Sequence, residues 1–185
     1  MSKGKLIVVS GASGVGKGTV LGLMMEKRKD LSFSVSATTR SPRPGEVDGK
    51  HYFFISKECF EEMIANDEFL EYDAHAANYY GTLRGQAEAK MKQGHVLLDI
   101  EPKGAEQVRR AAPDATLIFI MPPSMEELER RLRGRGDTSE EQIAIRMERA
   151  NWEMEQRHWY NHVVVNDDAQ RCADEILSII SNLEE

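Results

Sequence analysis

This sequence has little cysteine, no long apolar run and no excess of positive charge. Only 2 cysteines occur among its 185 residues, Cys59 and Cys172, and they form no C-x-x-C pair. Isolated cysteines of this kind are typical of reduced, buried thiols, which excludes a disulfide-stapled secreted scaffold. We therefore expect two free, buried thiols in a protein of the cytoplasm.

No apolar segment approaches the roughly 18 residues that a membrane-spanning helix needs. The first apolar run, residues 6–9, is also too short for the hydrophobic part of a secretion signal. We expect neither a membrane anchor nor a signal peptide. The five histidines show no spacing typical of a metal site, so no resident metal centre is expected.

Basic residues are in deficit, with 24 lysines and arginines against 31 acidic residues and a net charge of -7. Binding to nucleic acid depends largely on neutralising phosphates, so an acidic chain disfavours a nucleic-acid partner. Converging arginines could still hold one small anion. The length fits one domain with a small insertion.

The chain does contain short apolar strands that alternate with amphipathic helices. The pattern predicts strands at 5–10, 96–100, 115–121 and 162–166, and helices at 19–29, 124–135, 139–158 and 169–182. Ser124 with Glu127, and Ser139 with Gln142, have the spacing of helix-capping boxes. Alternating strands and helices with continuous apolar strands predict an α/β fold, a parallel sheet flanked by helices on both sides.

One segment interrupts this alternation. Within residues 36–93 the pattern predicts short strands at 52–55 and 69–75 around a helix at 57–66. We interpret 36–93 as a small mixed insertion into a core domain formed by 1–35 and 94–185. A helical lid is expected at about 126–158, with the polar stretch 134–137 as its hinge.

A glycine-rich loop follows the first predicted strand and leads into the first predicted helix. Residues 11–19 read GASGVGKGT and fit the pattern G-x-x-x-x-G-K. Glycines let successive backbone N–H groups point at phosphate oxygens, and the helix N-terminus adds partial positive charge. Gly18 stands where Ser or Thr usually approaches magnesium, and Thr19 follows it. The loop predicts a bound nucleoside triphosphate and leaves the acceptor open.

Further along the chain, polar residues point to a second anion site. Arg40 and Arg43 lie three apart in a proline-flanked turn, and arginine forks bind phosphate oxygens in pairs. Asp99 and Glu101 follow an apolar strand, at the strand end where ligands bind in α/β sheets. We expect these groups to hold the second substrate.

These stretches together resemble the guanylate kinases, which are ATP:GMP phosphotransferases of the nucleoside monophosphate kinase family. The resemblance runs from Leu6 to Asp168, and its most specific parts are residues 36–46, 78–81 and 131–136. It implies the P-loop kinase fold, with 36–93 as a GMP-binding insertion and a helical lid. It also implies ATP and GMP as substrates, with dGMP as a further acceptor, and Mg²⁺ as the cofactor that accompanies ATP.

The resemblance further implies a role for each matching residue. The ATP-binding set is Gly11, Ala12, Ser13, Gly14, Val15, Gly16, Lys17, Gly18, Thr19 and, near the adenine, Asn166. The GMP-binding set is Ser36, Arg40, Arg43, Tyr52, Glu71, Tyr80, Gly81, Thr82 and Glu101. The catalytic set is Lys17, Arg40, Asp99, Arg131, Arg135 and Arg146, and Thr19 and Asp99 are the candidates for contact with Mg²⁺. Glu101 is one methylene longer than the Asp that the family often has there.

Two alternatives stay open. The first is a non-catalytic binding module of the guanylate-kinase type, which we expect to lack Lys17 or the lid arginines; this chain has both. The second is a related kinase for another acceptor, which would differ in the base-reading residues Ser36, Glu71 and Thr82.

Overall fold

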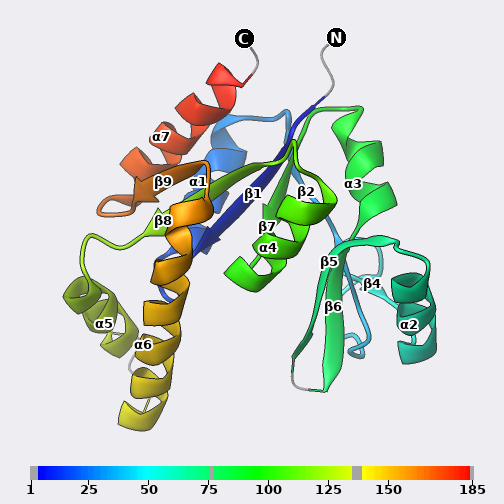
Figure 1. Ribbon diagram of the computed structural model, residues 1–185, viewed down its shortest axis with the longest axis horizontal. Helices are drawn as coiled ribbons and strands as arrows, with labels where there is room; N and C mark the ends of the chain where they lie inside the picture. Colours follow the sequence, from blue (N-terminus) through cyan, green and yellow to red (C-terminus); the bar gives the residue numbers. More distant parts are fainter. Residues whose placement is uncertain (1–3, 76, 135–138, 184–185) are drawn as a thin grey trace. The chain divides into compact units, whose positions relative to one another are not determined.

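A computed structural model describes residues 4–75, 77–134 and 139–183 of the chain. The chain forms two compact units. The first comprises Met1–Ile7, Asp30–Asp99 and Lys103–Ala115, and the second comprises Val8–Lys29, Ile100–Pro102 and Thr116–Glu185. Figure 1 labels their helices and strands.

A five-stranded sheet has the strand order β2-β7-β1-β8-β9. Its members are β1 (Leu6–Gly11), β2 (Leu31–Phe33), β7 (His95–Asp99), β8 (Thr116–Met121) and β9 (His162–Val165). β2 pairs in parallel with β7, and β8 pairs in parallel with β9. All six residues of β1 are buried, as expected for a parallel strand covered on both faces. The predicted parallel sheet is confirmed, and four of its strands lie within one residue of their predicted bounds.

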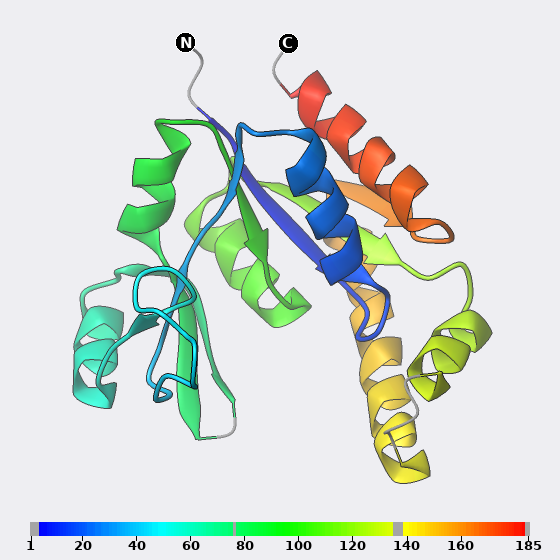
Figure 2. The same ribbon diagram turned by 180° about the vertical axis from the view of Figure 1, so that it is seen from behind.

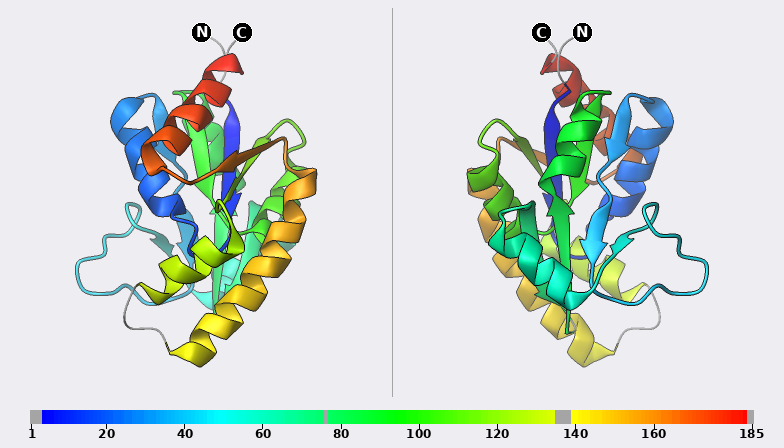
Figure 3. Two further views of the ribbon diagram at one scale, coloured as in Figure 1. Left: turned by 90° about the vertical axis from the view of Figure 1, so that its left-hand side faces the viewer. Right: turned by 90° about the vertical axis from the view of Figure 1, so that its right-hand side faces the viewer.

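Among the described residues of the second unit, four α-helices are present. They are α1 (Lys17–Lys27), α5 (Met125–Arg133), α6 (Glu140–Glu155) and α7 (Ala169–Asn182), and a 3-10 turn, η1 (Gln156–Trp159), follows α6. α1 packs against α7, as seen from behind in Figure 2, and α5 lies beside α6 in Figure 3. The predicted capping box at Ser139 and Gln142 is present, whereas at α5 only the Ser124 half of the box forms.

The first unit contains a second sheet with the order β4-β3-β6-β5. Its strands are β3 (Ser36–Thr38), β4 (Phe53–Phe54), β5 (Phe69–His75) and β6 (Asn78–Leu83), and α2 (Lys57–Ala65) packs against β6. The buried ring of Phe60 on α2 stacks on Phe69 and Tyr79, with ring centroids 4.3 and 5.1 Å away. This aromatic cluster gives the small sheet its own core.

Two further helices follow these strands, α3 (Arg84–Met91) and α4 (Pro102–Ala111). The sequence pattern did not single out either helix, or β2, β3 and β6. Each of these strands has six residues or fewer, and α3 buries only Ala87 along its length. In α3, so few buried apolar residues give a weak period in the sequence.

One of the two thiols differs from expectation. Cys172 is buried, but Cys59 is exposed. Cys59 lies on α2, a surface helix that buries only Phe60, so the expectation of two buried thiols was wrong for this residue. Among residues 4–75, 77–134 and 139–183, no helix combines the length and the apolar character that a membrane span requires.

Candidate active site

The predicted phosphate loop, residues 11–19, runs from the end of β1 into the first turn of α1. Gly14 and Gly16 have φ angles of 89° and 92°, in the left-handed region that strains other residues. Space is also short at both positions. A Cβ on Gly14 would lie 2.6 Å from Leu132 Cδ2, and one on Gly16 would lie 2.9 Å from Asn166 Nδ2. These glycines therefore fix the course of the loop that a phosphate cradle needs.

Lys17 is the first residue of α1. Burial lowers the pKa of its ammonium to about 8, although the carboxylates of Glu101 and Glu153 act in the opposite direction. Phosphate oxygens nearby would favour the charged form and raise this pKa again. The side chain is therefore suited to gain full charge when an anionic ligand enters the loop.

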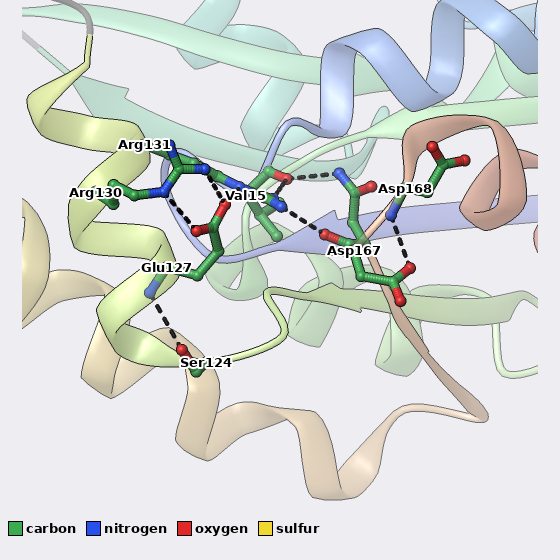
Figure 4. A network of polar contacts seen from close by, with 8 residues as sticks. Val15, Ser124, Glu127, Arg130, Arg131, Asp167 and Asp168 are labelled. Carbon is green, nitrogen blue, oxygen red and sulfur yellow. Dashed lines mark hydrogen bonds and ion pairs between the residues drawn. The ribbon is translucent and has the colours of Figure 1, made fainter.

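The backbone carbonyl of Val15 connects the phosphate loop to two distant side chains, those of Asn166 and Arg131. Figure 4 labels Val15 and Arg131. It accepts a hydrogen bond of 2.8 Å from Asn166 Nδ2 and one of 3.2 Å from Arg131 Nη1. Arg131 also donates to the Asn166 carbonyl at 3.0 Å and to Glu127 Oε1 at 2.8 Å. Asn166 is 4% exposed. The side chain of Asn166, which the resemblance implies lies near the adenine of ATP, thus supports the loop.

A buried carboxylate of α6 binds the phosphate loop at a second point, the backbone N–H of Ser13. Glu153 is 2% exposed, and its Oε2 accepts a hydrogen bond of 2.7 Å from the backbone N–H of Ser13. Arg149 donates to Glu153 Oε1 at 3.0 Å and forms an ion pair with Glu101. Burial raises the pKa of Glu153. Sequence reasoning missed this residue, because its i, i+4 spacing from Arg149 is that of an exposed, salt-bridged helix face.

The two acids predicted at the strand end, Asp99 and Glu101, have different surroundings. Asp99 is the exposed last residue of β7, whereas Glu101 precedes α4 and pairs with Arg149. Arg146 is half-buried on α6. Arg135 and residues 135–137 of the predicted hinge lie outside the described residues.

The residues available for Mg²⁺ are oxygen donors. Thr19 is exposed in the first turn of α1, next to Gly18, whose Cβ position has nothing within 4 Å. Within the described part of the chain, no three His, Cys, Asp or Glu side chains are grouped to hold an ion. Hydroxyl and carboxylate oxygens suit Mg²⁺, which usually binds through one or two such groups and the substrate's phosphates. Thr19 of the second unit and Asp99 of the first unit each carry an oxygen donor of this kind.

In the first unit, neighbouring residues hold the guanidinium of Arg40 in place. Its guanidinium forms two hydrogen bonds with Glu46, of 3.0 and 2.8 Å, and lies 5.5 Å from the centre of the Tyr52 ring. The Tyr52 ring meets Tyr80 edge-on at 6.0 Å. Arg40 lowers the pKa of Glu46 to about 2, helped by the backbone N–H of Arg43 at 2.6 Å. Four of the predicted phosphate-binding residues are thus close together.

The predicted base-reading residues form a row across three neighbouring strands. Ser36 of β3 pairs with Thr82 of β6, which also pairs with Glu71 of β5. Thr82 Oγ1 donates a hydrogen bond of 2.5 Å to Glu71 Oε1, and Glu71 is 7% exposed. Gly81 is close to its neighbours, because a Cβ there would lie 2.8 Å from Phe69 Cδ1. A buried carboxylate fixed in this way can accept hydrogen bonds from a ligand that offers paired donors.

Comparison with known proteins identifies one family. The guanylate kinase family model matches residues 3–183. The chain is 50% identical over 176 residues to a guanylate kinase of Trichormus variabilis, covering 95% of this chain and 88% of the relative. It is 48% identical over 186 aligned positions to that of Trichodesmium erythraeum, covering all of both chains.

A solved structure agrees with these relatives. The crystal structure of a guanylate kinase from Anaplasma phagocytophilum has a TM-score of 0.73 to this chain and 34% sequence identity. The match covers 98% of this chain and 86% of that one.

Proposed function

This chain belongs to the guanylate kinase family, and we propose that it transfers the γ-phosphoryl group of ATP to GMP, giving ADP and GDP. The observation that carries the choice of GMP is the buried carboxylate of Glu71, held by Thr82 in the row that includes Ser36. The enzyme would work in the cytoplasm, in the synthesis and recycling of guanine nucleotides.

Base chemistry supports this assignment. Guanine presents N1–H and N2–H₂ side by side, so one ionised carboxylate can accept from both. Adenine has an acceptor at N1 and would leave the Glu71 carboxylate unpaired. Buried polar groups that lose their partners in this way reject a wrong substrate by about 10⁴-fold. Ser36 and Thr82 complete the proposed base site, and Glu101 is a further candidate.

The phosphate of GMP is proposed to bind to Arg40, Arg43, Tyr52 and Tyr80, in the part of the chain that we assign as the GMP-binding insertion, 36–93. Arg40 supports this role because Glu46 and the Tyr52 ring hold its guanidinium before any ligand arrives. A preorganised fork loses little entropy when it binds an anion. dGMP would use the same contacts.

ATP is proposed to bind through the phosphate loop, with Lys17 and the loop amides on its β- and γ-phosphates. Mg²⁺ bound with ATP would neutralise charge on those phosphates, and Thr19 and Asp99 are the residues that would hold it. Arg131, Arg135 and Arg146, in the proposed lid at 126–158, would offset the charge of the transferring group. The GMP phosphate attacks in line and is already anionic, so no strong base is needed.

A coupled assay of ADP release, with ATP, Mg²⁺ and each of GMP, AMP, CMP and UMP, tests the proposal. We expect turnover with GMP and much less with the others. Glu71→Gln should lower the ratio of kcat/KM for GMP over AMP. Turnover of another acceptor in preference to GMP would favour the related kinase, and no turnover with any acceptor would favour the binding module.

A further inference from the structure

The carboxylate of Glu71 lies against a glycine of α4. A Cβ on Gly104 would lie 2.9 Å from Oε2, 3.4 Å from Cδ and 3.5 Å from Cγ of Glu71. The first of these distances is closer than real Cβ atoms come, so any side chain here would force a shift. The backbone of Gly104 is helical rather than left-handed, and alanine would suit it better than glycine. Position 104 therefore favours glycine because the Glu71 side chain fills the space that a Cβ atom would need.

The backbone beside Glu71 is held at both edges of its strand. β6 pairs with one edge, where Tyr72 lies opposite Gly81. At the other edge, the side chain of Gln107 on α4 makes the two hydrogen bonds that a neighbouring strand would make. Tyr72 N–H donates to Gln107 Oε1 at 3.1 Å, and Gln107 Nε2 donates to the Tyr72 carbonyl at 2.9 Å. With the strand fixed against α4, an added methyl group on Gly104 would move the carboxylate rather than the backbone.

From this contact we propose that Gly104 is a specificity-determining position. The lack of a side chain there gives the Glu71 carboxylate the place from which it reads the base of GMP, and Gln107 is the positioning residue that keeps β5 beside α4. The inference rests on the proposed function, since it assigns a determinant to the same base site. Neither residue is proposed to touch the reacting atoms.

Gly104→Ala tests the proposal, with Gly85→Ala as the matched control. Gly85 also lies in a helix of the first unit, α3, and its Cβ position has nothing within 4 Å. A shift of about 1 Å in a positioning group can cost about 100-fold in rate. We expect Gly104→Ala to lower kcat/KM for GMP by about 10- to 100-fold, to reduce the preference for GMP over AMP, and to leave the KM for ATP unchanged.

A double-mutant cycle separates this contact from general damage to the fold. Glu71→Asp shortens the side chain by one methylene and makes room for the added methyl group. Residues in direct contact give non-additive effects. The loss caused by Gly104→Ala should therefore be smaller in the Glu71→Asp background than in the wild type.

These measurements distinguish failure of the proposed function from failure of the inference about Gly104. If the wild-type protein does not phosphorylate GMP, the proposed function fails. If it does, and Gly104→Ala matches Gly85→Ala, only the present inference is overturned. Equal losses with GMP and AMP, or additive effects in the cycle, would also overturn it, because they would mean that the methyl group does not act through Glu71.

Discussion

The side-chain amide of Asn166 donates a hydrogen bond of 2.8 Å to the backbone carbonyl of Val15, 151 positions away in the sequence. Asn166 follows β9 directly, so the end of an edge strand fixes a peptide of the phosphate loop. The bond is buried, and a buried carbonyl that loses its donor costs free energy.

Asn166→Asp replaces the donor with an acceptor that faces the Val15 carbonyl. Repulsion should displace the loop and raise the KM for ATP by about 10-fold, which corresponds to about 1.4 kcal/mol. The KM for GMP should stay the same, because the proposed GMP site consists of other residues. Steady-state kinetics with each substrate varied in turn measure both constants. Asn182→Asp, at the exposed end of α7, is the control; an unchanged KM for ATP in Asn166→Asp would contradict the role.

The bond from Ser13 N–H to Glu153 predicts a difference between two variants. Glu153→Ala leaves the loop amide and Arg149 without this acceptor and should lower the free energy of unfolding by about 1–3 kcal/mol. Glu153→Gln keeps an oxygen acceptor of the same size and should cost less than half as much. Urea denaturation followed by circular dichroism measures both. If both variants were as stable as the wild type, Glu153 would not hold the loop.

The lowered pKa of Lys17 predicts that ATP binding takes up protons. At pH 8 about half of the free protein carries a neutral Lys17, and bound phosphates raise its pKa, so about half a proton should be taken up per ATP bound. Affinity should fall as the pH rises above 8. Calorimetry in two buffers with different ionisation enthalpies measures the uptake. In Lys17→Arg, whose guanidinium stays charged, the uptake at pH 8 should disappear.

The strand, loop and first helix around residues 11–19 could be predicted because each signal is local. Apolar residues fill β1, glycines occupy the left-handed positions Gly14 and Gly16, and the helix begins at Lys17. The capping box at Ser139 is local in the same way. The resemblance to a known family added the base-reading residues, which no local pattern connects.

What could not be predicted depends on contacts between distant segments. Glu153 has the helical spacing of a solvated residue, and only the fold brings it to Ser13, 140 positions away. Gln107 lies on a helix with little apolar character, and its bonds to Tyr72 appear only when α4 meets β5. Such residues satisfy backbone groups of other elements, so their own neighbours in the sequence carry no sign of the role.

Glu46 and Glu71 allow the two ends of the proposed GMP site to be tested separately. Glu46 holds the guanidinium of Arg40, which is proposed to bind the phosphate. Glu46→Gln should make this guanidinium less ordered, and every nucleoside monophosphate carries the phosphate that it would bind. We expect kcat/KM to fall by about 10-fold for GMP and for AMP alike, because Gln removes the carboxylate charge and one of the two oxygens that accept from Arg40. The ratio between the two acceptors should not change, whereas Glu71→Gln should change it. Measuring both acceptors with both variants makes the comparison internal. A changed ratio in Glu46→Gln would mean that the phosphate and base ends are coupled, since disorder at Arg40 would then reach the row of residues around Glu71.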